Sequence, residues 1–301
     1  MRYNRAPLRS PPTIAMDFHN LRYQATRPWA KRIAQAFLQA ANPQQGCDAA
    51  AAIVQQELEQ AARLHPLNDT QRETEFVLAE AYGQFCRDGR RIYALDSNLQ
   101  QALGHTRAPA TMPAAPSLPG GTFMLSLQHD GAYSAAFVSH DASQRRLDML
   151  LLQPDFAPSQ QPWQHRLEAA LTLGIHYPDS VQVPDTPALA SWRPWLQTAF
   201  GMLAMLTQPR LQLTDSWMLP LSAAQQLALQ GDAKSRQKQR AELLKSGNQE
   251  LLLASMPGLP ASWPQSVRAG YWRSQAGKQA QAEKLVWVAP RAATTGRLEK
   301  T

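Results

Sequence analysis

Two pairs of neighbouring residues have the types that metal-dependent phosphohydrolases use, His129-Asp130 and His140-Asp141. Both pairs fall at predicted turns of one β-meander, where aspartate is common because its carboxylate accepts hydrogen bonds from nearby backbone N–H groups. A metal site of that class needs further His and Asp ligands from helices, and the remaining histidines lack the i, i+4 pairing of a helical zinc site. We therefore predict no metal site.

No other part of the sequence offers a nucleophile, a base and an orienting group together. The chain lacks the G-x-S-x-G pattern of a nucleophile elbow and the G-x-x-x-x-G-K-[ST] and G-x-G-x-x-G patterns of phosphate-binding loops. Its two cysteines, Cys47 and Cys86, lack metal-ligand spacing, so we predict two buried, reduced thiols. We expect no catalytic residue and no cofactor, with an enzyme of unfamiliar site as the alternative.

The elements that would position a site begin with an arm and a mainly helical part, residues 1–107. Apolar spacing and capping residues predict helices at Pro28–Ala41, at Cys47–Leu64 and after Thr70, then a strand at Arg91–Leu95 and a short helix from Asp96 to Leu103. Residues 108–121 hold four prolines and two glycines, which predicts a Pro-rich linker or surface crossing. We place a domain boundary there.

Residues 122–301 are predicted to form an α+β part. Short turn segments separate three β-prone runs, which predicts an antiparallel β-meander of Thr122–Gln128, Ala132–Val138 and Arg146–Leu152. We predict helices around Trp163–Leu173, at Trp192–Leu206 and at Ser222–Gln230, and a solvated helix or disordered loop at Asp232–Ser246. The predicted fold class is α+β: a helical N-terminal part, a central meander, further helices and a C-terminal β-hairpin.

That hairpin is predicted for Val267–Pro290, where a polar loop separates two β-prone runs. Aromatic residues and arginine are enriched at binding hot spots, and arginine presents a forked donor. We predict the partner-binding residues Tyr271, Trp272, Arg273, Gln275 and Trp287. The alternative is that Trp272 and Trp287 face each other across the hairpin and bury against the domain.

The net charge of +7 is unevenly distributed. Residues 1–32 carry seven Lys or Arg against one acidic residue, residues 33–230 carry eleven against seventeen, and residues 263–301 carry seven against two. Clustered basic residues can neutralise phosphates, although basic ends are also often simply solvated. As an alternative to peptide binding, the sequence therefore predicts a nucleic-acid contact through Lys234, Arg236, Lys238, Arg240 and Arg273.

The location expected from the sequence is the cytoplasm. No window of about eighteen apolar residues is present, which argues against a membrane-spanning helix. The basic N-terminus lacks the apolar region of a signal peptide, and two unpaired cysteines suit a reducing compartment.

Three stretches of the chain, in order, resemble a family of proteins from phages, plasmids and other mobile elements. The most specific is G-Y-W-R-S-Q (Gly270–Gln275) followed by K-L-V-W-V-A-P (Lys284–Pro290). The others are F-G-M-L-A-M-L-T-Q-P-R (Phe200–Arg210) and R-R-I-Y-A-L-D-S-N-L-Q-Q-A-L-G-H-T (Arg90–Thr106). The loop Ala276–Glu283 departs from the family pattern, being poorer in Gly and Arg.

The family includes an anti-CRISPR protein directed at the type V-A CRISPR nuclease. That member recognises the nuclease's N-terminal segment as it emerges during translation and causes loss of the encoding mRNA. The resemblance implies a binding protein that acts on the nascent N-terminal peptide of such a nuclease, at the ribosome, in the cytoplasm of a host bacterial cell. An RNA-binding or nucleolytic mobile-element protein is the alternative.

Overall fold

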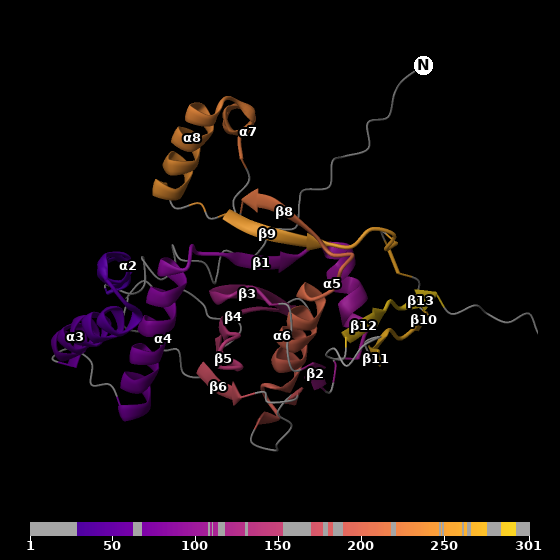
Figure 1. Ribbon diagram of the computed structural model, residues 1–301, viewed down its shortest axis with the longest axis horizontal. Helices are drawn as coiled ribbons and strands as arrows, with labels where there is room; N and C mark the ends of the chain where they lie inside the picture. The colour runs from indigo at the N-terminus through magenta and orange to yellow at the C-terminus, as the bar shows by residue number, and fades with distance from the viewer. Residues whose placement is uncertain are drawn as a thin grey trace, which may run out of the picture.

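The computed structural model describes residues 29–62, 68–107, 109, 111–113, 118–129, 132–152, 170–176, 180–182, 189–217, 221–246, 248, 250–260, 262–263, 266–275 and 284–292. Within these ranges the centre of the molecule is a seven-stranded sheet with the order β6-β5-β4-β3-β1-β9-β8. Its strands are β1 (Ile92–Leu95), β3 (Gly121–His129), β4 (Ala132–Asp141), β5 (Arg146–Leu152), β6 (Ala170–His176), β8 (Gln212–Trp217) and β9 (Glu250–Ser255). Figure 1 shows this sheet nearly edge-on between two groups of helices.

Strand β1 joins the two halves of the sheet. It runs parallel to both neighbours, and Tyr93 pairs with Leu125 of β3 on one side and Leu252 of β9 on the other. The remaining neighbours are antiparallel, so β3, β4 and β5 form the predicted meander and β6 extends it. The sheet therefore takes strands from both sides of the Pro-rich passage.

Three helices cover one face of the sheet: α2 (Ala30–Gln39), α3 (Pro43–Ala62) and α4 (Asp69–Arg87). Trp29, Ile33 and Phe37 repeat every four residues and are all buried, which confirms the predicted apolar face of the first helix. Full burial of a side chain of that size stabilises the fold by roughly 2–3 kcal/mol. The Trp29 indole N–H donates to Glu75 Oε2 at 2.9 Å, so this buried carboxylate satisfies the core tryptophan.

The other face packs against α6 (Arg193–Leu206), while α5 (Ser97–Gly104) lies beside the end of the sheet (Figure 1). Phe200 and Leu203 of α6 bury against strand residues such as Phe123. Asp96 caps α5 as predicted, because its carboxylate accepts a bond from Leu99 N at 2.7 Å.

The remaining elements lie at the margins of this body. Helices α7 (Ala223–Gln230) and α8 (Ala233–Lys245) project beyond β8 and β9 (Figure 1). At the opposite end stand the two-stranded pairs β10 (Val267–Arg268) with β13 (Arg291–Ala292) and β11 (Tyr271–Gln275) with β12 (Lys284–Val288). A third pair joins β2 (Thr111–Pro113) to β7 (Ser180–Gln182). No described helix combines the length and apolarity that a membrane crossing requires.

The α+β fold class is confirmed, with two differences in detail. The predicted helix around Trp163–Leu173 is wrong at its described end, because Ala170–Leu173 pair with β5 as part of β6. Of the two alternatives predicted for Asp232–Ser246, the helix is confirmed: α8 is capped by Asp232, whose carboxylate accepts from Ser235 N at 2.7 Å. The predicted helix at Cys47–Leu64 begins at Pro43 instead, because proline suits the first turn of a helix.

Candidate binding surface on the carboxy-terminal hairpin

The hairpin β11–β12 is built on a pair of tryptophans. Trp272 lies directly opposite Trp287 in the antiparallel register, with ring centroids 6.4 Å apart. Trp287 is 9% exposed and packs among Leu99, Leu103 and other residues of one apolar cluster, and the half-buried Trp272 packs against the same cluster. The alternative considered for these two residues, facing each other and burying against the domain, is therefore what the structure shows.

Hydrogen bonds from distant segments fix β12 in place. The Trp287 indole N–H donates to Thr106 Oγ1 at 3.2 Å. The buried Gln208 amide donates to Leu285 O at 2.9 Å and accepts from Trp287 N at 3.1 Å. One glutamine side chain thus bonds to the backbone of β12 as a neighbouring strand would, and these bonds hold the hairpin against the body.

Gly270 fixes β11 in the same way. Its N–H donates to His105 O at 3.0 Å, and its carbonyl accepts from Arg107 N at 3.3 Å. A Cβ at this position would lie 2.6 Å from Thr106 Oγ1 and 2.8 Å from Val288 O, so only glycine permits this approach. The glycine of the G-Y-W-R-S-Q stretch is explained by this contact.

Strand alternation divides the predicted binding residues between two faces. Trp272 faces inward, whereas Tyr271, Arg273 and Gln275 all point to the exposed side of β11. Tyr271 is 51% exposed, and no described carboxylate forms an ion pair with Arg273. The outer face of the hairpin, defined here as Tyr271, Arg273 and Gln275, is therefore an open polar and aromatic surface on a rigid base.

The predicted nucleic-acid residues do not form one surface. Four of them lie on α8 and Arg273 lies on β11, at opposite ends of the molecule (Figure 1). Arg240 forms an ion pair with Glu250 at the start of β9. Lys234 and Lys238 are exposed without an ion pair to any described residue, and their spacing of four places them on one side of the helix.

The second His-Asp pair belongs to a turn. The Asp141 carboxylate accepts from Ser143 Oγ at 2.6 Å, Ser143 N at 2.9 Å and Gln144 N at 3.0 Å. The Ser143 hydroxyl, followed by the Gln144 backbone N–H, holds the pKa of Asp141 below its usual value. His140 is 5% exposed in β4. His129 and Asp130 have side chains outside the described residues.

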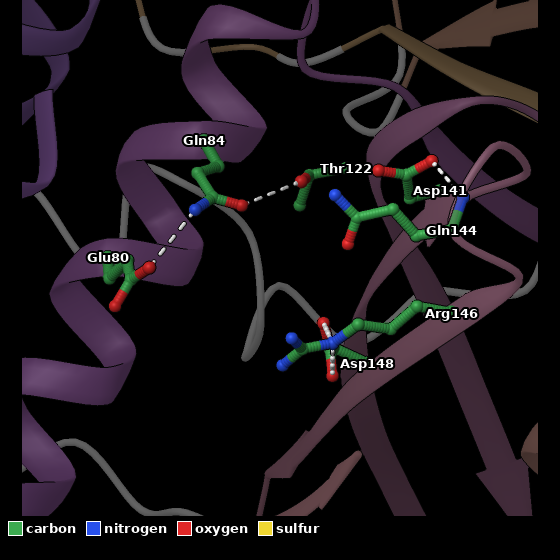
Figure 2. A network of polar contacts seen from close by, with 7 residues as sticks. All are labelled: Glu80, Gln84, Thr122, Asp141, Gln144, Arg146 and Asp148. Atoms are coloured by element: carbon green, nitrogen blue, oxygen red, sulfur yellow. Dashed lines mark hydrogen bonds and ion pairs between the residues drawn. The ribbon is translucent and has the colours of Figure 1, made fainter. Parts of the chain in front are cut away.

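Figure 2 shows polar residues of α4 near this turn, in structural contacts of their own. Gln84 accepts from Thr122 Oγ1 at 3.3 Å and donates to Glu80 at 3.1 Å, which ties the helix to β3. Arg146 and Asp148 pair at 2.7 Å along β5. In the described part of the chain, no three His, Cys, Asp or Glu residues are grouped so as to hold a metal ion.

Neither cysteine is prepared for chemistry. Burial, and then the nearby Glu80 carboxylate, raises the pKa of Cys47. Burial also raises the pKa of Cys86. Both thiols are free, and a raised pKa keeps them protonated at neutral pH, where the thiolate would be the nucleophile.

The sequence interpretation missed three arginines that the fold brings to Gly270. Arg107 follows α5, Arg268 lies on β10 and Arg291 lies on β13, and all three are exposed. In the sequence, these arginines could have been found through the short β-prone segments that flank the hairpin. They were missed because two-residue strands carry too little periodicity to predict.

Comparisons with known proteins include a similarity to a solved structure. No family model matches the chain, and no curated protein matches it. The crystal structure of AcrVA2 superposes with a TM-score of 0.46 at 12% sequence identity, over 91% of this chain and 97% of that chain. This similarity assigns the chain to no family.

Proposed function

We propose that this chain is an anti-CRISPR-like binding protein of a phage or plasmid. Its target is the nascent N-terminal peptide of a type V-A CRISPR nuclease, and its effect is loss of the nuclease mRNA in the host cytoplasm. The observation that carries the proposed binding mode is the outer face of the hairpin, Tyr271, Arg273 and Gln275, exposed above a buried Trp287. The target comes from the resemblance of Gly270–Gln275 and Lys284–Pro290 to the family's signature.

The chemistry of the outer face suits an extended peptide. The guanidinium of Arg273 can bind a carboxylate through two parallel N–H donors. The amide of Gln275 both donates and accepts, as peptide backbone requires. Tyr271 adds a large ring whose ordering loses little side-chain entropy. Since β11 is held on a fixed base, binding does not require the surface to be organised first.

The binding experiment uses a fluorescent peptide of the nuclease N-terminus and the full chain. We expect Arg273→Ala and Tyr271→Ala each to weaken binding by about tenfold or more, as hot-spot truncations do. Arg210→Ala, a change at an exposed arginine after α6, is the matched control and should bind as the parent does. In cells, mRNA of a reporter carrying the nuclease N-terminal codons should fall only when those codons are present. Absence of peptide binding together with unchanged mRNA would overturn the proposal.

RNA binding through α8 is the second candidate function, favoured by the exposed Lys234 and Lys238. A gel shift at two salt concentrations separates the two functions. Phosphate binding weakens steeply with salt because counterions are released, whereas peptide binding should change little. We expect no nuclease activity, and cleavage of labelled RNA that survives removal of metal and of contaminants would contradict this expectation.

A further inference from the structure

Backbone contacts gather three exposed arginines around Gly270. Arg107 is bound there directly, because its N–H donates to Gly270 O at 3.3 Å. Arg268 precedes Gly270 by two residues, and the antiparallel register places Arg291 opposite Arg268. We call Arg107, Arg268 and Arg291 the arginine surface. Its first and last members are 184 positions apart in the sequence.

Arg268 and Arg291 are an unfavourable pair on their own. Residues directly opposite in an antiparallel pair send their side chains to the same face, with Cα atoms roughly 5 Å apart. Like charges in that arrangement repel and destabilise the pair. Arginine cannot escape the repulsion by losing its proton at any ordinary pH. The β10–β13 ladder therefore keeps two fixed positive charges side by side.

The chain does not neutralise these charges within its described part. Elsewhere on the surface, described arginines meet carboxylates: Arg32 pairs with Glu57, and Arg146 pairs with Asp148. None of the three residues of the arginine surface forms an ion pair with a described carboxylate. An anionic group of a partner, bound between these arginines, would offset their mutual repulsion by attracting each of them.

We propose that the arginine surface binds the phosphate backbone of single-stranded RNA. Three positive charges suit a repeating anion, and the chain neighbours of Arg268 and Arg291, Ala269 and Ala292, are small and exposed. Tyr271 follows Gly270 with its ring 51% exposed, and such a ring beside basic residues lets an unpaired base stack. The net charge of +7 brings polyanions to the protein.

This site differs from both surfaces of the proposed function. Its charged residues include neither Arg273, which is assigned to the peptide, nor the lysines of α8, which lie away from the hairpin (Figure 1). Tyr271 is shared with the outer face of the hairpin. The proposal therefore goes beyond peptide recognition and does not depend on it. RNA and peptide should therefore depend on different charged residues and both depend on Tyr271.

The test measures fluorescence anisotropy of a labelled fifteen-nucleotide oligouridine with the full chain at several salt concentrations. The main variant is Arg268→Ala with Arg291→Ala, two exposed positions whose loss of charge should leave the thermal midpoint at or above that of the parent. The matched control is Lys31→Ala with Arg210→Ala, which removes the same charge from two exposed positions outside the candidate surfaces. Both variants are also assayed with the peptide.

Two lost phosphate contacts should lower the slope of log affinity against log salt by about 1.4, since each contact contributes about 0.7 for a single strand. At 0.1 M salt this corresponds to about 25-fold weaker RNA binding. We expect the control variant to stay within about twofold of the parent and Tyr271→Phe to retain the binding that Tyr271→Ala loses. Peptide binding should be unchanged in the Arg268/Arg291 variant.

Three results would overturn the proposal. The first is failure of the parent chain to bind oligouridine at low salt. The second is a loss in the control variant equal to that in the arginine variant, which would show that only total charge matters. The third is polyglutamate of equal charge competing as well as RNA, which would make an acidic protein segment the partner. The peptide assay is separate, so none of these three outcomes decides the proposed peptide binding. That function is tested by the peptide assay alone.

Discussion

Gln208 should be the residue on which attachment of the hairpin depends most. Its amide lies 8% exposed after α6 and serves two backbone groups of β12, donating to Leu285 O and accepting from Trp287 N. Gln208→Ala removes both partners while leaving the strand where it is. The Trp287 N–H and the Leu285 carbonyl then face a gap instead of hydrogen-bonding groups.

The expected loss follows from counting those groups. A buried donor or acceptor left without a partner costs about 1–3 kcal/mol, and a typical paired hydrogen bond contributes about 1 kcal/mol net. Two orphaned groups, one of them only partly buried, give an expected loss of about 2–4 kcal/mol for Gln208→Ala. Such a loss is a large share of the stability of an ordinary domain.

Urea unfolding followed by circular dichroism measures the loss, and hydrogen exchange at the Trp287 amide shows whether it is local. Gln197→Ala on the exposed side of α6 is the matched control. Gln208→Glu provides a second check, because a carboxylate still accepts from Trp287 N but cannot donate to Leu285 O. Protonation restores a donor, so Gln208→Glu should approach the parent as pH falls. A loss below about 0.5 kcal/mol for Gln208→Ala, or no faster exchange at Trp287, would refute this account of the hairpin.

Three further substitutions have outcomes fixed by the geometry. Gly83→Ala places a Cβ 2.2 Å from the buried Phe37 ring, so thermal melting should show a loss of about 3 kcal/mol or more, and an unchanged midpoint contradicts this packing. Trp287→Phe loses an indole hydrogen bond and should destabilise the fold by about 1–2 kcal/mol. The buried Trp272 indole N–H has no partner in the described part, so Trp272→Phe should destabilise the fold less. A larger loss for Trp272→Phe than for Trp287→Phe in urea unfolding would be inconsistent with these contacts. The hydroxyl and backbone donors of its turn lower the pKa of Asp141 from 3.8. The contribution of Asp141 to stability is therefore present above the unfolded-state pKa and disappears as pH falls through the lower folded-state value. Asp141→Ala should flatten the acid limb of the curve of stability against pH below about pH 4, and an unaltered limb would count against the turn.

Local patterns were enough to predict the elements whose signals are contained in one stretch. The helix that buries Ile33 and Phe37 and the meander of β3, β4 and β5 have clear periods of 3.6 and 2, and both are confirmed. The strand β9 was not predicted, because Leu251–Leu253 is a short apolar run that fits a buried strand or a helix equally well. Its parallel pairing with β1 joins residues about 160 positions apart, and no local pattern reports such a contact.

Predicting the candidate site had the same limit. The hairpin itself was predictable from two β-prone runs, and alternation already separates Trp272 from its neighbours. Which face turns inward is decided by Thr106 and Gln208, which approach β12 from elsewhere in the sequence. The arginine surface depends on pairing Arg268 with Arg291, a match that becomes visible only once the hairpin between them has closed.

The stretch that resembles a family signature therefore combines two kinds of residue, and the distinction decides which of them to test. Gly270, Trp287 and Pro290 are buried where the hairpin meets the body, so changes there act on the fold before they act on any partner. Tyr271 and Arg273 do not hold the hairpin to the body, because their side chains are exposed. Relatives that share the buried residues would share the hairpin whatever they bind. Only the exposed residues can distinguish one target from another, and binding measured with variants of those residues tests the function separately from the fold.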